Sequence, residues 1–347
     1  MKPAMEVELK FQVPAASRAP LAAEMQRGKA APERISLAAS YLDTPDRRLA
    51  RAGLAWRLRR EGRQWVQTLK AAGATALERF EHDAPRTGPV HDAFAHAGTG
   101  PGDRLIEILQ QARGQGLEPR VRYATEVRRT LRRIRTRGAV VEVALDEGHL
   151  SAGGVRLPIR EIEFELVSGS PTAMLALAER WRRRFGLVLD PRSKAERGDR
   201  LAEGHRSPAV RHARAPQRPD GAGPLAAVVS AIDEGLSQVM HNAIGLIDGD
   251  ASLGPAHASQ LCEGIRRVLE ALNDFEGPPS PIPADLVEGL RSWRDALEQC
   301  EQARARARDV AALCRSERVQ ALLLAWITWL ATLQEGRAAA AASSAPD

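Results

Sequence analysis

The sequence is poor in aromatic residues and has no long apolar run. Aromatic residues make up 4% of its 347 residues, so few side chains could stack on bases, which argues against nucleic acid as a partner. No uninterrupted apolar run reaches the roughly 18 residues that a membrane-spanning helix needs, and no apolar signal segment follows Met1. We therefore expect a cytoplasmic protein with no membrane partner.

Cysteine is also scarce. The chain has three cysteines, Cys262, Cys300 and Cys314, all in its C-terminal third. An odd number of widely spaced cysteines neither frames a disulfide scaffold nor matches the spacing of a zinc site. This pattern fits a reducing compartment.

The net charge of +6 hides an uneven distribution along the chain. Residues 1–218 carry 40 basic and 26 acidic side chains, a net charge of +14, whereas residues 219–347 carry 10 and 18, a net charge of −8. A basic first part and an acidic second part indicate two modules with different partners.

The first part of the chain has the period-two pattern of β-strands. The clearest segments are residues 5–13, 53–61, 65–70, 139–145 and 159–167. Because these strands follow one another directly, we predict an antiparallel α+β fold. Two hairpins are expected, one across Glu61-Gly62-Arg63 and one across Glu147-Gly148. A helix is expected at 171–185, with Ser170 as its N-cap.

The C-terminal part has the three- and four-residue spacing of helices. Residues 207–223 are rich in Pro, Gly, Ala and Arg and are predicted to be a linker. Four helices, at 225–246, 258–275, 285–307 and 311–333, are expected to form an all-α bundle over residues 224–336. The Ala- and Ser-rich tail at 337–347 is expected to be disordered.

Charged residues alternate along the first strand, where period two places Glu6, Glu8 and Lys10 on one face. The alternation recurs in Arg57 and Arg59, in Arg79, Glu81 and Asp83, in Glu142 and Asp146, and in Glu161, Glu163 and Glu165. In a sheet that closes on itself, these faces would converge on a charged interior suited to an anion. In an open sheet they would face solvent.

Lysine is rare in this arginine-rich chain. Five of the 50 basic residues are lysines, namely Lys2, Lys10, Lys29, Lys70 and Lys194. Because an ammonium group is a compact point charge, the lysines on the charged segments are candidates for phosphate contacts.

An ordered set of motifs resembles the CYTH domains, also called triphosphate tunnel metalloenzymes. Residues 6–10 resemble the ExExK strand, 41–44 the Tyr-x-Asp-Thr turn, 57–59 the Arg-x-Arg strand, 161–166 the glutamate-rich strand and 193–198 the Ser-Lys-x-x-Arg-Gly turn. The resemblance covers a domain at residues 1–206. It implies an eight-stranded antiparallel β-barrel tunnel with flanking helices that binds a triphosphate together with Mg²⁺ or Mn²⁺.

The resemblance also implies roles for the matching residues. It assigns metal binding to Glu6, Glu8, Glu161, Glu163 and Glu165. It assigns phosphate binding to Lys10, Arg57, Arg59, Lys70, Arg79, Arg128, Lys194 and Arg197. It assigns catalysis to Glu142, Asp146 and Lys10, where the two carboxylates orient the attacking water or hold a second cation. The chain departs from the family at Glu126, where many members have a basic residue, so one phosphate contact is lost or Arg129 compensates for it.

The C-terminal bundle resembles a CHAD domain of about half the usual length. Ser259 and Cys262 stand where that family has a histidine and an arginine, and Arg266 and Arg267 remain of its basic cluster. Because a polyanion binder should be basic, we expect a degenerate bundle that is structural or binds a protein partner of unknown identity.

These observations favour metal-dependent hydrolysis of inorganic tripolyphosphate to phosphate and diphosphate. Thiamine triphosphate hydrolysis and adenylate cyclisation remain as alternatives on the same fold. A non-catalytic polyphosphate-binding module is an alternative from a different class.

Overall fold

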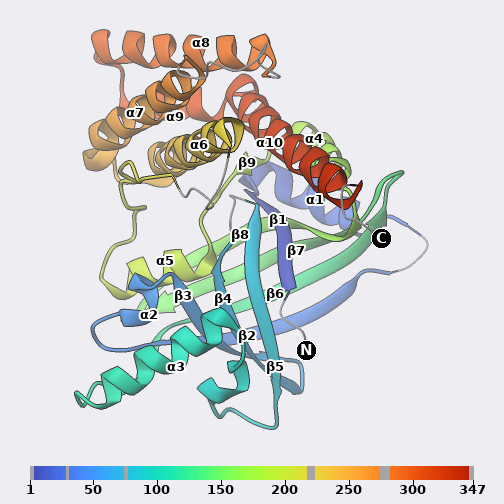
Figure 1. The fold of residues 1–347 in the computed structure, drawn as a ribbon, viewed down its shortest axis with the longest axis vertical. Helices are drawn as coiled ribbons and strands as arrows, with labels where there is room; N and C mark the ends of the chain where they lie inside the picture. The colour runs from blue at the N-terminus through green and yellow to red at the C-terminus, as the bar shows by residue number, and fades with distance from the viewer. Residues whose placement is uncertain (1–3, 29–30, 74–76, 217–222, 274–281, 344–347) are drawn as a thin grey trace. The chain divides into compact units, whose positions relative to one another are not determined.

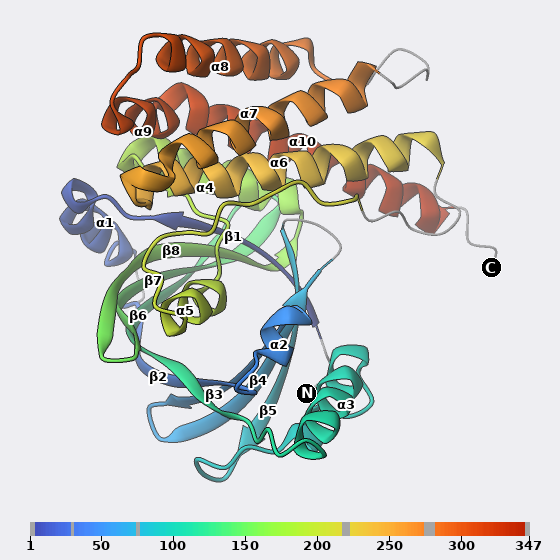
Figure 2. The same ribbon diagram turned by 90° about the vertical axis from the view of Figure 1, so that its left-hand side faces the viewer.

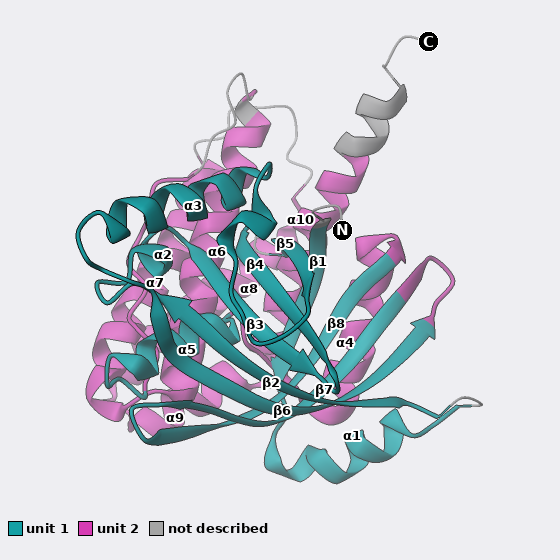
Figure 3. Cartoon of the chain, turned by 90° about the horizontal axis from the view of Figure 1, so that it is seen from below, with its two compact units in different colours: residues 1–134, 141–167, 192–206 teal, residues 135–140, 168–191, 207–347 magenta. Residues whose placement is uncertain are grey.

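The computed structural model describes residues 4–28, 31–73, 77–216, 223–273 and 282–343. The chain divides into two compact units (Figure 3). Unit 1 comprises residues 1–134, 141–167 and 192–206, and unit 2 comprises residues 135–140, 168–191 and 207–347. Each unit is described by itself.

Unit 1 is built on a closed antiparallel β-barrel (Figure 1). Its eight strands are β1 (Ala4–Gln12), β2 (Glu33–Asp43), β3 (Leu54–Glu61), β4 (Gln64–Ala72), β5 (Glu78–Arg86), β6 (Arg120–Arg135), β7 (Ala139–Ala152) and β8 (Val155–Gly169). They follow the order β5-β4-β3-β2-β6-β7-β8-β1, and pairing of β1 with β5 closes the sheet. The predicted eight-stranded barrel is therefore confirmed.

The first predicted hairpin is confirmed and the second is wrong. Strands β3 and β4 pair up to Glu61 opposite Gln64, across Gly62 with its positive φ of 59°. Strand β7, in contrast, runs without a break through Gly148. A Cβ at Gly148 would lie 2.0 Å from the Glu126 carbonyl oxygen, so this glycine allows a close approach to β6 rather than a turn. The turn into β8 lies at Gly153 and Gly154, which have φ of 54° and 79°.

An apolar cluster fills part of the barrel and includes a helix. Helix α5 (Lys194–Ala202) is capped by Ser193, whose hydroxyl accepts a hydrogen bond from the Glu196 amide. Its Leu201 packs with the side chains of Leu37, Ala39, Tyr41, Tyr123, Val127, Leu150, Ala152 and Ile159. Gly198 lies so close to the Tyr123 ring that a Cβ would come within 2.1 Å of it. Figure 2 shows α5 lying within the curve of the strands.

The remaining helices of unit 1 lie outside the sheet or between strands. They are α1 (Arg18–Met25), α2 (Arg48–Arg51) and α3 (Gly100–Arg113), with short 3-10 turns at Ala15–Ser17 and Ala93–His96. Leu105 and Ile108 of α3 pack on Trp56 and Leu69 of the barrel wall. The Asp43 carboxylate accepts hydrogen bonds from the backbone amides of Thr44, Leu49 and Ala50. This set of bonds fixes the Tyr-x-Asp-Thr turn at the start of α2.

Unit 2 is helical. It contains α4 (Pro171–Phe185), the short strand β9 (Val188–Leu189), α6 (Pro224–Asp248), α7 (Gly254–Asn273), α8 (Ala284–Gln302), α9 (Ala307–Arg315) and α10 (Glu317–Ser343), with a 3-10 turn at Ala251–Leu253. The bounds and N-cap predicted for the helix at 171–185 are confirmed. Past the linker, the described residues form five helices rather than the four expected. The expected third helix ends at Gln302, followed by Arg304 with a positive φ of 50°.

Helix α4 is fastened to α10 at both of its ends. Arg182, which is 1% exposed, donates paired hydrogen bonds to Glu317 at 2.7 and 2.8 Å, and further bonds to Glu179. At the other end, Glu335 accepts a hydrogen bond from the Ser170 hydroxyl at 2.7 Å and two from Thr172. The two helices therefore run antiparallel.

The described part of the predicted linker is held by side chains of α6 and α7. The Asn242 side chain exchanges two hydrogen bonds with the backbone of Arg211, at 2.8 and 3.2 Å. Arg267 donates to the Arg214 carbonyl at 2.7 Å. Residues 217–222 of that linker and residues 344–347 of the predicted tail lie outside the described residues, and α10 itself continues to Ser343.

A buried histidine pair next to α3 makes the stability of unit 1 depend on pH. The Gln67 side-chain amide donates to the Asp92 carbonyl and lies 3.0 Å from His96 Nε2, while His96 Nδ1 lies 3.1 Å from His82 Nδ1. Since the Gln67 nitrogen is a donor, His96 Nε2 must accept and stay unprotonated. Burial and the neighbouring His82 lower the pKa of His96 to about 4.

We predict that the free energy of unfolding falls as pH drops from about 6.5 to about 4. The unfolded chain binds a proton at this histidine through that window, whereas the folded chain does not. Urea titrations of the wild type and of His96→Gln across the window test this prediction. The wild-type curve should fall more steeply, and parallel curves would contradict it.

Candidate functional site

The barrel brings most of the predicted site residues together in its interior. Antiparallel pairing sets Glu6 opposite Arg79, Glu8 opposite Glu165 and Lys10 opposite Glu163. Because side chains alternate along a strand, the charged face of β1 and the glutamates of β8 line the same surface. The closed sheet makes that surface an interior, so the open-sheet alternative does not apply.

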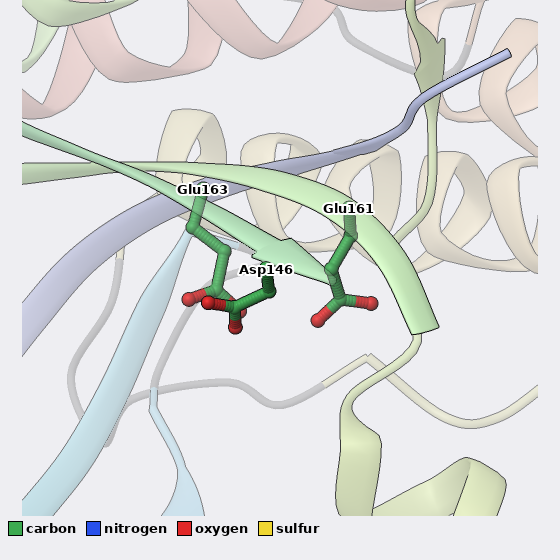
Figure 4. Close-up of side chains that lie close together, drawn as sticks. All are labelled: Asp146, Glu161 and Glu163. Atoms are coloured by element: carbon green, nitrogen blue, oxygen red, sulfur yellow. The ribbon is translucent and has the colours of Figure 1, made fainter. Parts of the chain in front are cut away.

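Three carboxylates from β7 and β8 form the tightest acidic group, which we name the carboxylate triad: Asp146, Glu161 and Glu163 (Figure 4). One oxygen from each lies within 4.8 Å of the others. The side chains of Asp146, Glu161 and Glu163 are 0%, 2% and 16% exposed. Three buried carboxylates at this distance require compensating positive charge.

That charge comes from basic residues of β6 and α5. Lys194 Nζ lies 2.7 Å from Asp146, 2.5 Å from Glu161 and 2.8 Å from Glu163. Arg129 bonds both oxygens of Asp146 at 2.7 Å and reaches Glu163 at 2.5 Å. Arg197 bonds Glu161 at 3.1 Å. The triad is thus enclosed by three cations.

The pKa shifts of these groups agree with the geometry. Burial alone would lower the pKa of Lys194, but the triad outweighs it and holds that pKa well above the ordinary value. Burial would raise the pKa of Glu163, but Lys194 and Arg129 outweigh it and hold that pKa well below its usual range. The pKa of Asp146 is lowered for the same reason. The paired groups are therefore charged near neutral pH.

A second acidic group, which we name the outer carboxylates, consists of Glu6, Glu8, Glu142 and Glu165. Burial and the charges of Glu6, Glu142 and Glu8 raise the pKa of Glu165 to about 7. The cations here are farther away, with Lys70 3.6 Å from Glu6 and Arg79 4.0 Å from Glu8. Like charges directly opposite on neighbouring strands repel, so this group has an excess of negative charge.

The outer carboxylates fit a divalent cation. They offer only oxygen donors, which Mg²⁺ and Mn²⁺ prefer, and Glu8 faces Glu165 directly across β1 and β8. A bound cation would also relieve the repulsion between them.

Strands β3, β4 and β5 supply a cationic wall. Arg57 donates to Thr68 at 3.0 Å and lies 3.6 Å from Glu81, which also pairs with Lys70. Arg59 pairs with Glu61. Burial and the neighbouring Arg57 lower the pKa of Arg59 to about 10, which still leaves it charged at neutral pH. Lys10 donates to the Arg192 carbonyl.

Arg128 is the predicted site residue that the structure does not bring to the interior. Arg128 and Glu126 are exposed on one face of β6, whereas Arg129 lies on the opposite face and bonds the triad. Glu126 faces His149 at 3.6 Å with 66% of its side chain exposed, so its acidic charge does not enter the barrel. Arg129 and Glu81 were not assigned roles from the sequence, although Glu81 shares the alternating face of Arg79.

The neighbours Arg128 and Arg129 provide a matched test of this placement. We expect Arg129→Ala to lower the free energy of unfolding by about 3 kcal/mol or more, because it leaves buried Asp146 and Glu163 short of a partner. Arg128→Ala should change it by less than about 0.5 kcal/mol, as exposed substitutions do. Urea unfolding of both variants measures the difference, and equal losses would contradict the placement.

Comparisons with known proteins agree with this class of charged barrel. The family model of the CYTH domain matches residues 4–198. An inorganic triphosphatase of Haemophilus influenzae is 28% identical over 169 residues, which cover 48% of this chain and 46% of that protein. The chain thus matches about half the length of this curated relative.

Solved structures with the same domain are more distant. A candidate adenylyl cyclase from Hippeastrum, described as having a dominant triphosphatase activity, is 18% identical with a TM-score of 0.42, covering 58% of this chain and 96% of that one. The inorganic triphosphatase NE1496 is 17% identical with a TM-score of 0.22, covering 49% of this chain and 78% of that one.

The family match spans more than half of the sequence, and the chain belongs to the CYTH domain family. The motifs that suggested this family are confirmed as part of one barrel. Within the described residues, no helix combines the length and the apolarity needed to cross a bilayer.

Proposed function

We propose that this protein hydrolyses inorganic tripolyphosphate to phosphate and diphosphate in a reaction that depends on Mg²⁺ or Mn²⁺. The observation that carries the proposal is the meeting, inside one closed barrel, of a cationic wall with unbalanced carboxylates. A triphosphate needs the first and a divalent cation needs the second. The family membership and the inorganic triphosphatase relative support it.

Each side of the interior has its own part in binding. Glu6, Glu8 and Glu165 would hold the metal ion, which supplies charge neutralisation at the phosphate oxygens. The phosphates would be bound by Arg57, Arg59, Lys70, Arg79 and Lys10. Because these cations are fixed on strands, they stabilise the charge that builds up on the leaving diphosphate without moving.

Of the two carboxylates expected to act in catalysis, Glu142 is the better placed to orient water. Its carboxylate pairs with Arg133 at 3.1 Å and is 21% exposed. Asp146 is fully buried and already accepts from Arg129 and Lys194. A carboxylate with its oxygens so engaged has little capacity to bind a water, so we assign Asp146 a structural role.

The helical unit is proposed to be structural or to bind a protein. Arg266 pairs with Glu263 and Glu270 on the surface of α7, and Arg267 bonds Gln238 and the Arg214 carbonyl. The two arginines that remain of a CHAD-like cluster are thus engaged within the unit, which argues against a polyphosphate site there.

Substitution of the first strand tests the proposed reaction. Glu6→Gln combined with Glu8→Gln should lower metal-dependent phosphate release from tripolyphosphate by about 100-fold or more, because the metal loses two charged ligands. Phosphate, diphosphate and cyclic AMP are measured with tripolyphosphate, ATP or thiamine triphosphate, each with Mg²⁺, Mn²⁺ or chelator. Arg128→Ala, outside the barrel, is the control and should keep its activity.

The alternatives give different results in the same assay. Turnover of thiamine triphosphate or formation of cyclic AMP in place of phosphate from tripolyphosphate would assign a different substrate. Tight tripolyphosphate binding that survives chelation and gives no product would show a receptor instead of an enzyme.

A further inference from the structure

Lys194 occupies the centre of the carboxylate triad in the manner of a bound cation. Its ammonium nitrogen is within 2.8 Å of an oxygen of each of Asp146, Glu161 and Glu163. An ammonium group has three donors, and here three carboxylates take them. Its side chain is 14% exposed, so solvent competes little for these bonds.

The charges of the triad are already balanced. Its three carboxylates are met by Lys194, Arg129 and Arg197, whose contacts all lie at 3.1 Å or less. The outer carboxylates differ, since their cations at Glu6 and Glu8 lie at 3.6 and 4.0 Å. A divalent cation would gain more by binding there than by displacing a buried ammonium.

We propose that Lys194 is the resident cation of the triad and excludes a divalent ion from it, so that the substrate-free protein binds one divalent ion, at the outer carboxylates. The proposal rests on the proposed function, because it concerns the metal of the same site. It also removes Lys194 from the phosphate ligands of the resting protein, since each of its donors is already used. Glu161 and Glu163 then hold Lys194 rather than the metal.

The test counts ions bound to the full chain without substrate. Mn²⁺ is titrated against the protein, and free Mn²⁺ is followed by its electron paramagnetic resonance signal. The wild type should bind one ion per chain. Lys194→Met, which removes the charge and keeps the length of the side chain, should bind two. Lys194→Arg keeps the charge and should stay at one.

Variants of the carboxylates locate each ion. In the wild-type background, Glu161→Gln should leave Mn²⁺ binding unchanged, whereas Glu165→Gln should weaken it at least tenfold. In the Lys194→Met background, Glu161→Gln should return the count from two to one. If Lys194→Met alone is unstable, Mn²⁺ should raise its melting temperature by more than it raises that of the wild type.

Several outcomes would overturn the proposal. They are two ions on the wild type with one lost in Glu161→Gln, a count of one on folded Lys194→Met, and no greater melting shift in that variant. These results would leave the proposed function standing if tripolyphosphate is still hydrolysed. A wild type that binds no Mn²⁺ and releases no phosphate would instead refute the proposed function.

Discussion

The rest of the structure depends on how the barrel balances the charges that its strands turn inward. A closed sheet with alternating acidic and basic residues on its inner face removes those groups from water, and each unpaired charge would cost several kcal/mol. The carboxylate triad meets this requirement through Lys194, Arg129 and Arg197. Helix α5 carries Lys194 and Arg197, and its Leu201 packs into the apolar cluster of the same barrel. One helix therefore supplies both apolar packing and charge.

The two acidic groups differ in what they leave for a ligand. The triad has short contacts to its cations, whereas the outer carboxylates have longer ones, and Glu165 has a pKa of about 7. The cations of the wall are themselves paired with carboxylates such as Glu81 and Glu61. A polyanion therefore has to compete with these carboxylates, and a divalent cation at the outer group would ease that competition. Metal and triphosphate binding should favour each other for this reason.

Period-two patterns predicted the barrel and most of its interior because each strand alternates strictly between two faces. The same rule could have separated Arg129 from Arg128, had the face been set by the buried Tyr123, Thr125 and Val127. The turn expected at Gly148 was wrong because the sequence does not show that β6 passes close to this glycine. The pairing of Lys194 with the triad could not be predicted, since it depends on where α5 enters a closed sheet.

The division into compact units also differs from what local sequence indicates. The CYTH match runs to residue 198 and includes α4, yet α4 belongs to the helical unit. The buried Arg182 and the hydrogen bonds to Glu335 explain this, because they fasten both ends of α4 to α10, more than 130 residues further along the chain. Asn242 likewise holds the segment that was expected to be a linker. The helical region is therefore built around an element of the CYTH sequence, and removing it would leave the buried face of α4 without its partner.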